Sequence, residues 1–137
     1  MTEAMKMADC DPAMTACIEG LDQEGRGVAR VDDKVTFIEG ALPGETVAYR
    51  LIKRKPSYNL AETTRVLRPS TYRVQPKCRY FGVCGGCSLQ HLDPMVQVMA
   101  KQRIFEDQLR RIGRVEAEQL LAPVIGPFWE YRFRARL

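Results

Sequence analysis

Five short runs of β-type residues follow one another between Thr15 and Leu67, with glycine, proline and acidic residues in the gaps. They span residues 15–21, 27–31, 34–38, 45–53 and 60–67. Short strands separated by regularly spaced turn residues are typical of small barrels and sandwiches. We therefore predict a mainly β fold, in which residues 14–70 form a small five-stranded antiparallel barrel.

Two turns and one strand of this barrel are specified locally. Asp32-Asp33 fits a tight hairpin, and Pro43-Gly44 joins the fixed φ of proline to a residue that accepts positive φ. In residues 45–53, Val47, Tyr49 and Leu51 share one face of the strand. We expect that face to lie in the core.

Basic residues are concentrated in the middle of the chain. Residues 26–79 contain twelve Lys/Arg and five Asp/Glu, whereas residues 1–25 contain one lysine and six acids. Residues 80–137 contain eight basic and six acidic residues. A basic domain favours a polyanionic partner, and a solvated surface with no partner has the same composition.

The most basic stretch is Lys53-Arg54-Lys55-Pro56-Ser57-Tyr58-Asn59, which we expect to be the loop between the fourth and fifth strands. Lysine and arginine neutralise phosphates, and an exposed tyrosine stacks on unpaired bases. The stretch therefore fits binding of single-stranded nucleic acid, and it also fits a solvated hairpin loop. The candidate RNA-binding residues here are Arg50, Lys53, Arg54, Lys55 and Tyr58.

Three of the five cysteines lie within ten residues, spaced Cys78-x5-Cys84-x2-Cys87. Thiolates this close are predicted to hold one metal centre, and Gly85 and Gly86 allow the backbone to fold closely around it. On spacing alone, zinc with His91 as a fourth ligand and an iron–sulfur cluster both remain open. Cys10 and Cys17 are interpreted as a tail thiol and a strand residue.

The last third of the chain contains helix signals and then an alternating segment. Asp93-Pro94 and Gly113 bracket a helix over residues 94–112, whose apolar side chains we expect to pack on the protein itself. Residues 129–137 alternate as in a strand, with Arg132, Arg134 and Arg136 on one face. A strand without a sheet suggests a truncated central β domain over 93–137 and hence a longer protein.

The remaining segments and the compartment follow from composition. Residues 1–13 are predicted to be a flexible tail, and residues 71–92 a linker with the cysteine motif. The chain has no run of eighteen apolar residues, and its first ten residues lack the pattern of a secretory signal. We therefore expect a cytoplasmic protein without a membrane partner, in which clustered cysteines bind metal rather than form disulfides.

Several of these motifs resemble a known family. Glu24-Gly25-Arg26-Gly27-Val28-Ala29-Arg30 and Leu42-Pro43-Gly44-Glu45-Thr46-Val47 are similar to a TRAM domain, an OB-like RNA-binding barrel. The stretch from Cys78 to His91 resembles the cluster motif of bacterial 23S rRNA (uracil-5-)-methyltransferases. Residues 111–113 and 131–136 continue the resemblance in the same order.

The resemblance implies an N-terminal, RNA-recognising part of an S-adenosylmethionine-dependent enzyme that forms 5-methyluridine in 23S rRNA. It implies a [4Fe-4S] cluster on Cys78, Cys84 and Cys87, with a fourth cysteine beyond Leu137 and with His91 a neighbour. The nucleophilic cysteine, the base and the S-adenosylmethionine pocket would lie in a catalytic domain outside this chain, so no catalytic residue is assigned here. The alternative is a free-standing, zinc-stapled RNA-binding module without catalysis, and neither reading expects DNA as a partner.

Overall fold

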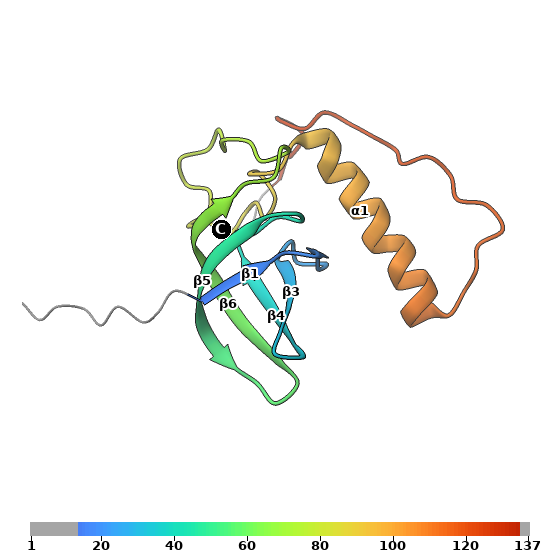
Figure 1. Cartoon of the computed structure of the whole chain (residues 1–137). Helices are drawn as coiled ribbons and strands as arrows, with labels where there is room; N and C mark the ends of the chain where they lie inside the picture. The colour runs from blue at the N-terminus through green and yellow to red at the C-terminus, as the bar shows by residue number, and fades with distance from the viewer. Residues whose placement is uncertain (1–13, 135–137) are drawn as a thin grey trace, which may run out of the picture.

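The computed structural model describes residues 14–134, which form a strongly curved six-stranded sheet, one helix beside it, and a long C-terminal segment (Figure 1). The mainly β prediction is confirmed. The elements are β1 Met14–Cys17, β2 Gly20–Leu21, β3 Gly27–Val31, β4 Lys34–Glu39, β5 Thr46–Arg54, β6 Tyr58–Arg68, α1 Pro94–Gln108 and a terminal π-helical turn η1 Leu109–Gly113.

The strand order β1-β5-β6-β4-β3-β2 places consecutive strands β1 and β2 at opposite edges of the sheet. The backbone of the segment between β1 and β2 hydrogen-bonds both to the residue before β5 and to β3. The Ile18 N–H donates to the Glu45 carbonyl at 2.9 Å, and the Glu19 N–H donates to the Val28 carbonyl at 2.8 Å. Because one short segment bonds first beside β5 and then to β3, the sheet curls toward closure, as expected for an OB-like fold.

The strand count and one pairing direction differ from the prediction. The first predicted run is divided into β1 and β2, because the chain changes partners at Ile18-Glu19. Four of the five pairings are antiparallel, but β4 and β6 are parallel. The β5–β6 hairpin returns β6 into the position next to β4, so β6 and β4 run in the same direction.

Both predicted turns are present. Asp32 and Asp33 have φ of 49° and 61°, as a two-residue type I′ hairpin requires. Gly44 has φ of 81°, and the Glu45 N–H donates to the Leu42 carbonyl at 3.2 Å across the Pro43-Gly44 turn.

The predicted core face of β5 is confirmed. Val47 and Tyr49 are buried, and Leu51 packs against the same cluster. The cluster is filled out by Ile18, Ile38 and four alanines, whose small side chains suit a narrow, tightly curved sheet.

The helix forms where the sequence predicts it. The Asp93 carboxylate accepts the N–H groups of Met95 and Val96 at 2.9 and 3.3 Å, and Pro94 occupies the first helical position. The helical segment continues as η1 to Gly113.

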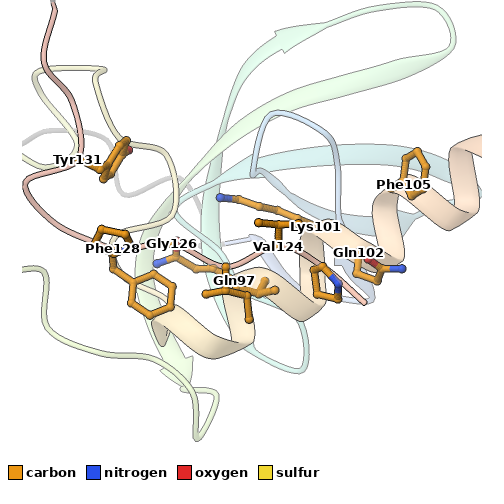
Figure 2. A pocket seen from close by; sticks show the side chains of 12 residues that line it. Gln97, Lys101, Gln102, Phe105, Val124, Gly126, Phe128 and Tyr131 are labelled. Atoms are coloured by element: carbon orange, nitrogen blue, oxygen red, sulfur yellow. The ribbon is translucent and has the colours of Figure 1, made fainter. Parts of the chain in front are cut away.

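The predicted packing of this helix is wrong for the described residues. No side chain of α1 is buried, and Met95, Met99 and Phe105 are each more than half exposed. The helix stands beside the sheet, and the irregular segment after Gly113 runs along it (Figure 1). An open groove of about 600 Å³ separates α1 from residues 123–131 (Figure 2).

The predicted final strand is also wrong over residues 129–134, which are irregular. An alternating run gains strand geometry only from a neighbouring strand, and the described residues provide none at this point. The remaining three positions of that prediction, the tail over 1–13 and Cys10 lie outside the described residues.

Within residues 14–134, no helix has the length and apolar character needed to cross a bilayer.

Candidate nucleic-acid interface and cysteine loop

The predicted basic residues of the barrel lie on one hairpin. Lys53 and Arg54 belong to β5, opposite Leu60 and Asn59 of β6, so the loop is limited to residues 55–57. The Lys55 N–H closes the turn on the Tyr58 carbonyl at 2.9 Å. Sheet pairing therefore extends further than the sequence predicted, and it holds these cations on a regular scaffold.

Arg50 differs from the other cations of the hairpin. Its guanidinium donates to the Glu62 carboxylate on the neighbouring strand, and the two form an ion pair. The side chains of Lys53 and Arg54 are exposed, and no ion pair to an acid is found for them among residues 14–134. They are therefore available to an anion.

Tyr58 does not stand alone at the tip of a loop. Its ring meets the ring of Phe37 edge to face, with centroids 5.6 Å apart, and the guanidinium of Arg26 lies 4.9 Å from the Phe37 centroid. The three side chains form a half-buried row from the turn before β3 across β4 to β6, in which Arg26 is also ion-paired to Asp22 and Glu24. Aromatic rings in such a row can stack on a base. Neither Phe37 nor Arg26 was among the residues predicted from the sequence. Period-two alternation in β4 could have found Phe37, because Thr36 and Ile38 on either side point into the core.

Arg132 and Arg134 are exposed on the irregular C-terminal segment, separate in the chain from the hairpin. The structure connects this segment to the linker through Lys77, whose ammonium lies 5.4 Å from the Trp129 ring centroid. Arg136 lies outside the described residues.

Residues 78–92, here called the cysteine loop, begin with successive turns. The Phe81 N–H donates to the Cys78 carbonyl at 3.1 Å, and the Cys84 N–H donates to the Tyr80 carbonyl at 2.9 Å. Cys84 and Cys87 are exposed, Cys78 is half-buried, and all three are free thiols. The Gly86 backbone passes so near Cys84 that an added Cβ would lie 3.5 Å from its Sγ.

The donor set can be compared with the predicted metal. Three free thiols on one short, mostly exposed loop are the ligand type that an iron–sulfur cluster or zinc requires. Among residues 14–134, however, no three Cys, His, Asp or Glu side chains are gathered at metal-binding positions. The three thiols are therefore of the ligand type that the predicted metal centre requires. To bind one metal centre, the loop would have to change conformation so that the three sulfur atoms come closer together.

The loop is docked on the barrel at its C-terminal end. Leu89 and Leu92 are buried, and Leu89 lies against Gly25, where an added Cβ would be only 3.1 Å from the leucine Cδ2. Arg73 and Leu92 form an antiparallel bridge. The position of the cysteines relative to the barrel is thus set by apolar contacts and backbone pairing.

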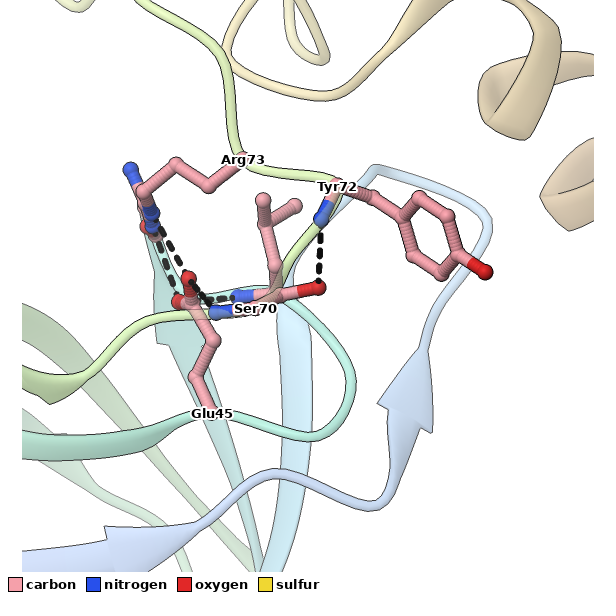
Figure 3. A network of polar contacts seen from close by, with 6 residues as sticks. Glu45, Ser70, Tyr72 and Arg73 are labelled. Carbon is pink, nitrogen blue, oxygen red and sulfur yellow. Dashed lines mark hydrogen bonds and ion pairs between the residues drawn. The ribbon is translucent and has the colours of Figure 1, made fainter.

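A buried carboxylate connects the linker to the barrel (Figure 3). Glu45 is 1% exposed and accepts hydrogen bonds from Arg73 Nε at 2.7 Å, Arg73 Nη2 at 2.9 Å, Ser70 N at 3.1 Å and Leu42 N at 3.0 Å. Burial opposes ionisation, but the bonds from Arg73, Ser70 and Leu42 outweigh it and lower the pKa of Glu45. Arg73 also donates to the Gly40 carbonyl at 2.6 Å.

His91 is paired with the same linker through its carbonyl, which accepts the Val74 N–H at 2.9 Å. It is 3% exposed, its ring stands 5.1 Å from the Phe81 ring, and neither ring nitrogen has a hydrogen-bond partner within residues 14–134. Burial, together with the charge of Arg73, lowers its pKa to about 4, against the opposing effect of Glu45. The imidazole is therefore neutral at pH 7.

Comparison with known protein families identifies the class of the barrel. Residues 13–64 match the TRAM domain family, so the chain contains a TRAM domain, as the resemblance indicated.

The similarity extends past the barrel to particular proteins. The chain is 58% identical over 123 residues to 23S rRNA (uracil(1939)-C(5))-methyltransferase RlmD of Azoarcus sp., an alignment that covers 90% of this chain and 28% of the relative. It is also 56% identical to the protein of the same name in Aromatoleum aromaticum, over 89% of this chain and 28% of that relative. The protein of the same name in Chromobacterium violaceum is 56% identical, over 92% of this chain and 24% of that relative. The resemblance to this family is confirmed, and the chain spans about a quarter of the length of these relatives.

Proposed function

We propose that this chain is the RNA-binding, N-terminal part of an S-adenosylmethionine-dependent 23S rRNA uracil-C5 methyltransferase of the cytoplasm. The observation that carries the proposal is the similarity over nine-tenths of the chain to proteins named for that activity. The relatives' remaining three quarters would supply the chemistry. This chain would supply binding and orientation of the RNA.

The β5–β6 hairpin is the proposed contact with the RNA backbone. Lys53 and Arg54 are exposed cations on paired strands, and Lys55 continues them into the turn. Each phosphate that such a cation neutralises releases counterions, which makes the affinity depend on salt. The row of Arg26, Phe37 and Tyr58 gives the same sheet aromatic faces for stacking. Arg132, Arg134 and Arg136 are proposed as a second basic surface.

Cys78, Cys84 and Cys87 are proposed to hold a [4Fe-4S] cluster, with a fourth cysteine from the part of the relatives' length that this chain does not span. Such a cluster, when bound, would act as a structural staple, because ligand bonds add directly to folding free energy. The zinc alternative, with His91 as the fourth ligand, is less well supported: His91 is buried against Phe81, whereas Cys84 and Cys87 are exposed.

Salt-dependent RNA binding tests the proposal. The chain should bind a single-stranded fragment of 23S rRNA, and the affinity should fall steeply with salt. Changing Lys53, Arg54 and Lys55 together to alanine should reduce the slope of log affinity against log salt by about 2, because single strands lose about 0.7 per contact.

A charge-matched control distinguishes an effect of the hairpin surface from an effect of the chain's net charge. Changing the exposed Arg103, Arg110 and Arg111 of the helical segment to alanine removes the same charge at a different place. Equal losses in the two triple variants would reject the hairpin as the contact, and no binding at low salt would reject RNA as the partner.

A further inference from the structure

An open cavity of about 390 Å³ lies between the barrel and the cysteine loop. It is lined by Gly40, Arg73, Val74, Gln75, Pro76, Phe81 and His91. The Val74 N–H donates to the His91 carbonyl at 2.9 Å, so backbone pairing holds the linker wall and the loop wall together. The cavity is separate from both the basic hairpin and the three thiols.

His91 gives this cavity an unusual polar group. Nearly all buried polar atoms in folded proteins have hydrogen-bond partners, yet within residues 14–134 both nitrogens of this imidazole have none. A neutral imidazole carries one N–H donor and one acceptor. An unpaired donor and acceptor on a residue that lines a cavity can recognise a ligand edge that offers the complementary pair, once the ligand displaces the atoms that enclose them.

The other walls define the shape and charge of the ligand. Phe81, Pro76 and Val74 are apolar, and the Phe81 ring borders the same space as the His91 ring. The guanidinium of Arg73 is already engaged by Glu45 and the Gly40 carbonyl, so it is not free to hold a phosphate. The walls therefore favour a flat, uncharged ring with polar edge atoms over an anion.

The surroundings favour RNA as the source of that ring. Residues 63–92, which include most of the cavity wall, contain five Lys/Arg and no Asp/Glu. An excess of basic residues in the segment that forms the cavity favours a nearby phosphate backbone. Sequence-specific RNA recognition commonly works by turning unpaired bases outward, stacking them on aromatic rings and pairing their edges with side chains.

We propose that this cavity takes up one unpaired nucleobase of the bound RNA, with the base edge hydrogen-bonded to His91 and its face against Phe81. The proposal rests on the RNA-binding function proposed above, and it adds a base-reading site to the backbone contacts of the hairpin.

His91 is the only histidine in the chain, so its ring resonances report on the cavity alone. The 137-residue chain, labelled with ¹⁵N, is titrated with each of the four ribonucleosides, and with ribose, inorganic phosphate and Zn²⁺ as separate probes. At least one nucleoside should shift the imidazole nitrogens saturably, and ribose and phosphate should not. A response to phosphate or zinc alone, or to none of the nucleosides, would overturn the proposal.

A pair of variants tests the site with RNA itself. Phe81→Leu keeps apolar volume but removes the ring, and it should weaken binding of a 23S rRNA fragment about tenfold, as loss of one stacked base does. Tyr72→Leu, an exposed aromatic on the same linker outside the cavity, should leave affinity unchanged. The amide spectrum of each variant checks that the fold is intact.

The two proposals fail differently in this experiment. Tight, salt-dependent RNA binding that neither shifts His91 nor depends on Phe81 would remove the base site and leave the hairpin contact standing. Absence of RNA binding by the unaltered chain would remove the RNA function and the base site with it.

Discussion

Arg73 in the linker donates two hydrogen bonds to the buried carboxylate of Glu45 in the barrel, at 2.7 and 2.9 Å. The two residues are 28 positions apart, and their contact fixes the linker before the cysteine loop to the turn that precedes β5. The carboxylate has little solvent to replace these bonds, so the arrangement depends on both partners.

Arg73→Ala should therefore be strongly destabilising. It leaves a buried carboxylate without its cation, which costs about 3–5 kcal/mol in comparable sites. Arg50→Ala is the matched control, because Arg50 pairs with the more exposed Glu62, and such pairs contribute less than about 1 kcal/mol. Urea unfolding of both variants measures the difference. Equal costs would mean that the linker is not fastened to the barrel through Glu45.

Stability should also fall as the pH is lowered from about 6.5 to about 4. The pKa of His91 is 6.5 in the unfolded chain and about 4 in the fold, so the unfolded state binds a proton first. The contribution of the neutral His91 to the free energy of unfolding is fully present above pH 6.5. Up to about 3 kcal/mol of it is lost as the pH falls from 6.5 to about 4. Glu45, whose pKa is lowered from 4.5, adds a further loss only as the pH falls below that value.

Urea titrations at several pH values, repeated with His91→Phe, isolate the imidazole. The variant keeps an aromatic ring but cannot take up a proton, so its stability should be nearly level between pH 6.5 and 5. A slope equal to that of the unaltered chain would assign the pH dependence to other groups.

The docking of the cysteine loop on the barrel can be tested at two glycines that have the same backbone φ angle. Gly25 and Gly44 both have φ of 81°, and alanine is strained at either position. At Gly25 the new Cβ would also lie 3.1 Å from Leu89, whereas nothing lies within 4 Å at Gly44. Gly25→Ala should therefore cost more unfolding free energy than Gly44→Ala, and it should increase hydrogen exchange in residues 78–92. Identical behaviour of the two variants would show that Leu89 does not hold the loop.

The features that the sequence predicted correctly are those with local causes. The Asp32-Asp33 hairpin, the Pro43-Gly44 turn and the Asp93 cap each follow from residues within a few positions of one another. The core face of β5 follows from alternation alone. In each case the deciding interaction is complete within a single turn or strand.

The features that were missed depend on contacts between distant segments. The contact of Glu45 with Arg73 and the burial of His91 leave no signature in residue spacing. Alternation in β4 points to Phe37, but not to its contact with Arg26. The strand predicted for residues 129–137 failed over its described part for the related reason that alternation describes a strand only if another strand is present to pair with it.

The proposed role of the three clustered thiols is tested by the metal content of the longer protein proposed above. Purified without oxygen, it should contain iron and sulfide in equal amounts, and Cys84→Ser should lose both and melt at a lower temperature, because the staple is gone. Cys17→Ser is the matched control: Cys17 is also an exposed free thiol, but it lies on β1 and should not affect the cluster. Retention of iron and sulfide by Cys84→Ser would remove that residue from the ligand set, and zinc without sulfide in the unaltered protein would support the zinc alternative.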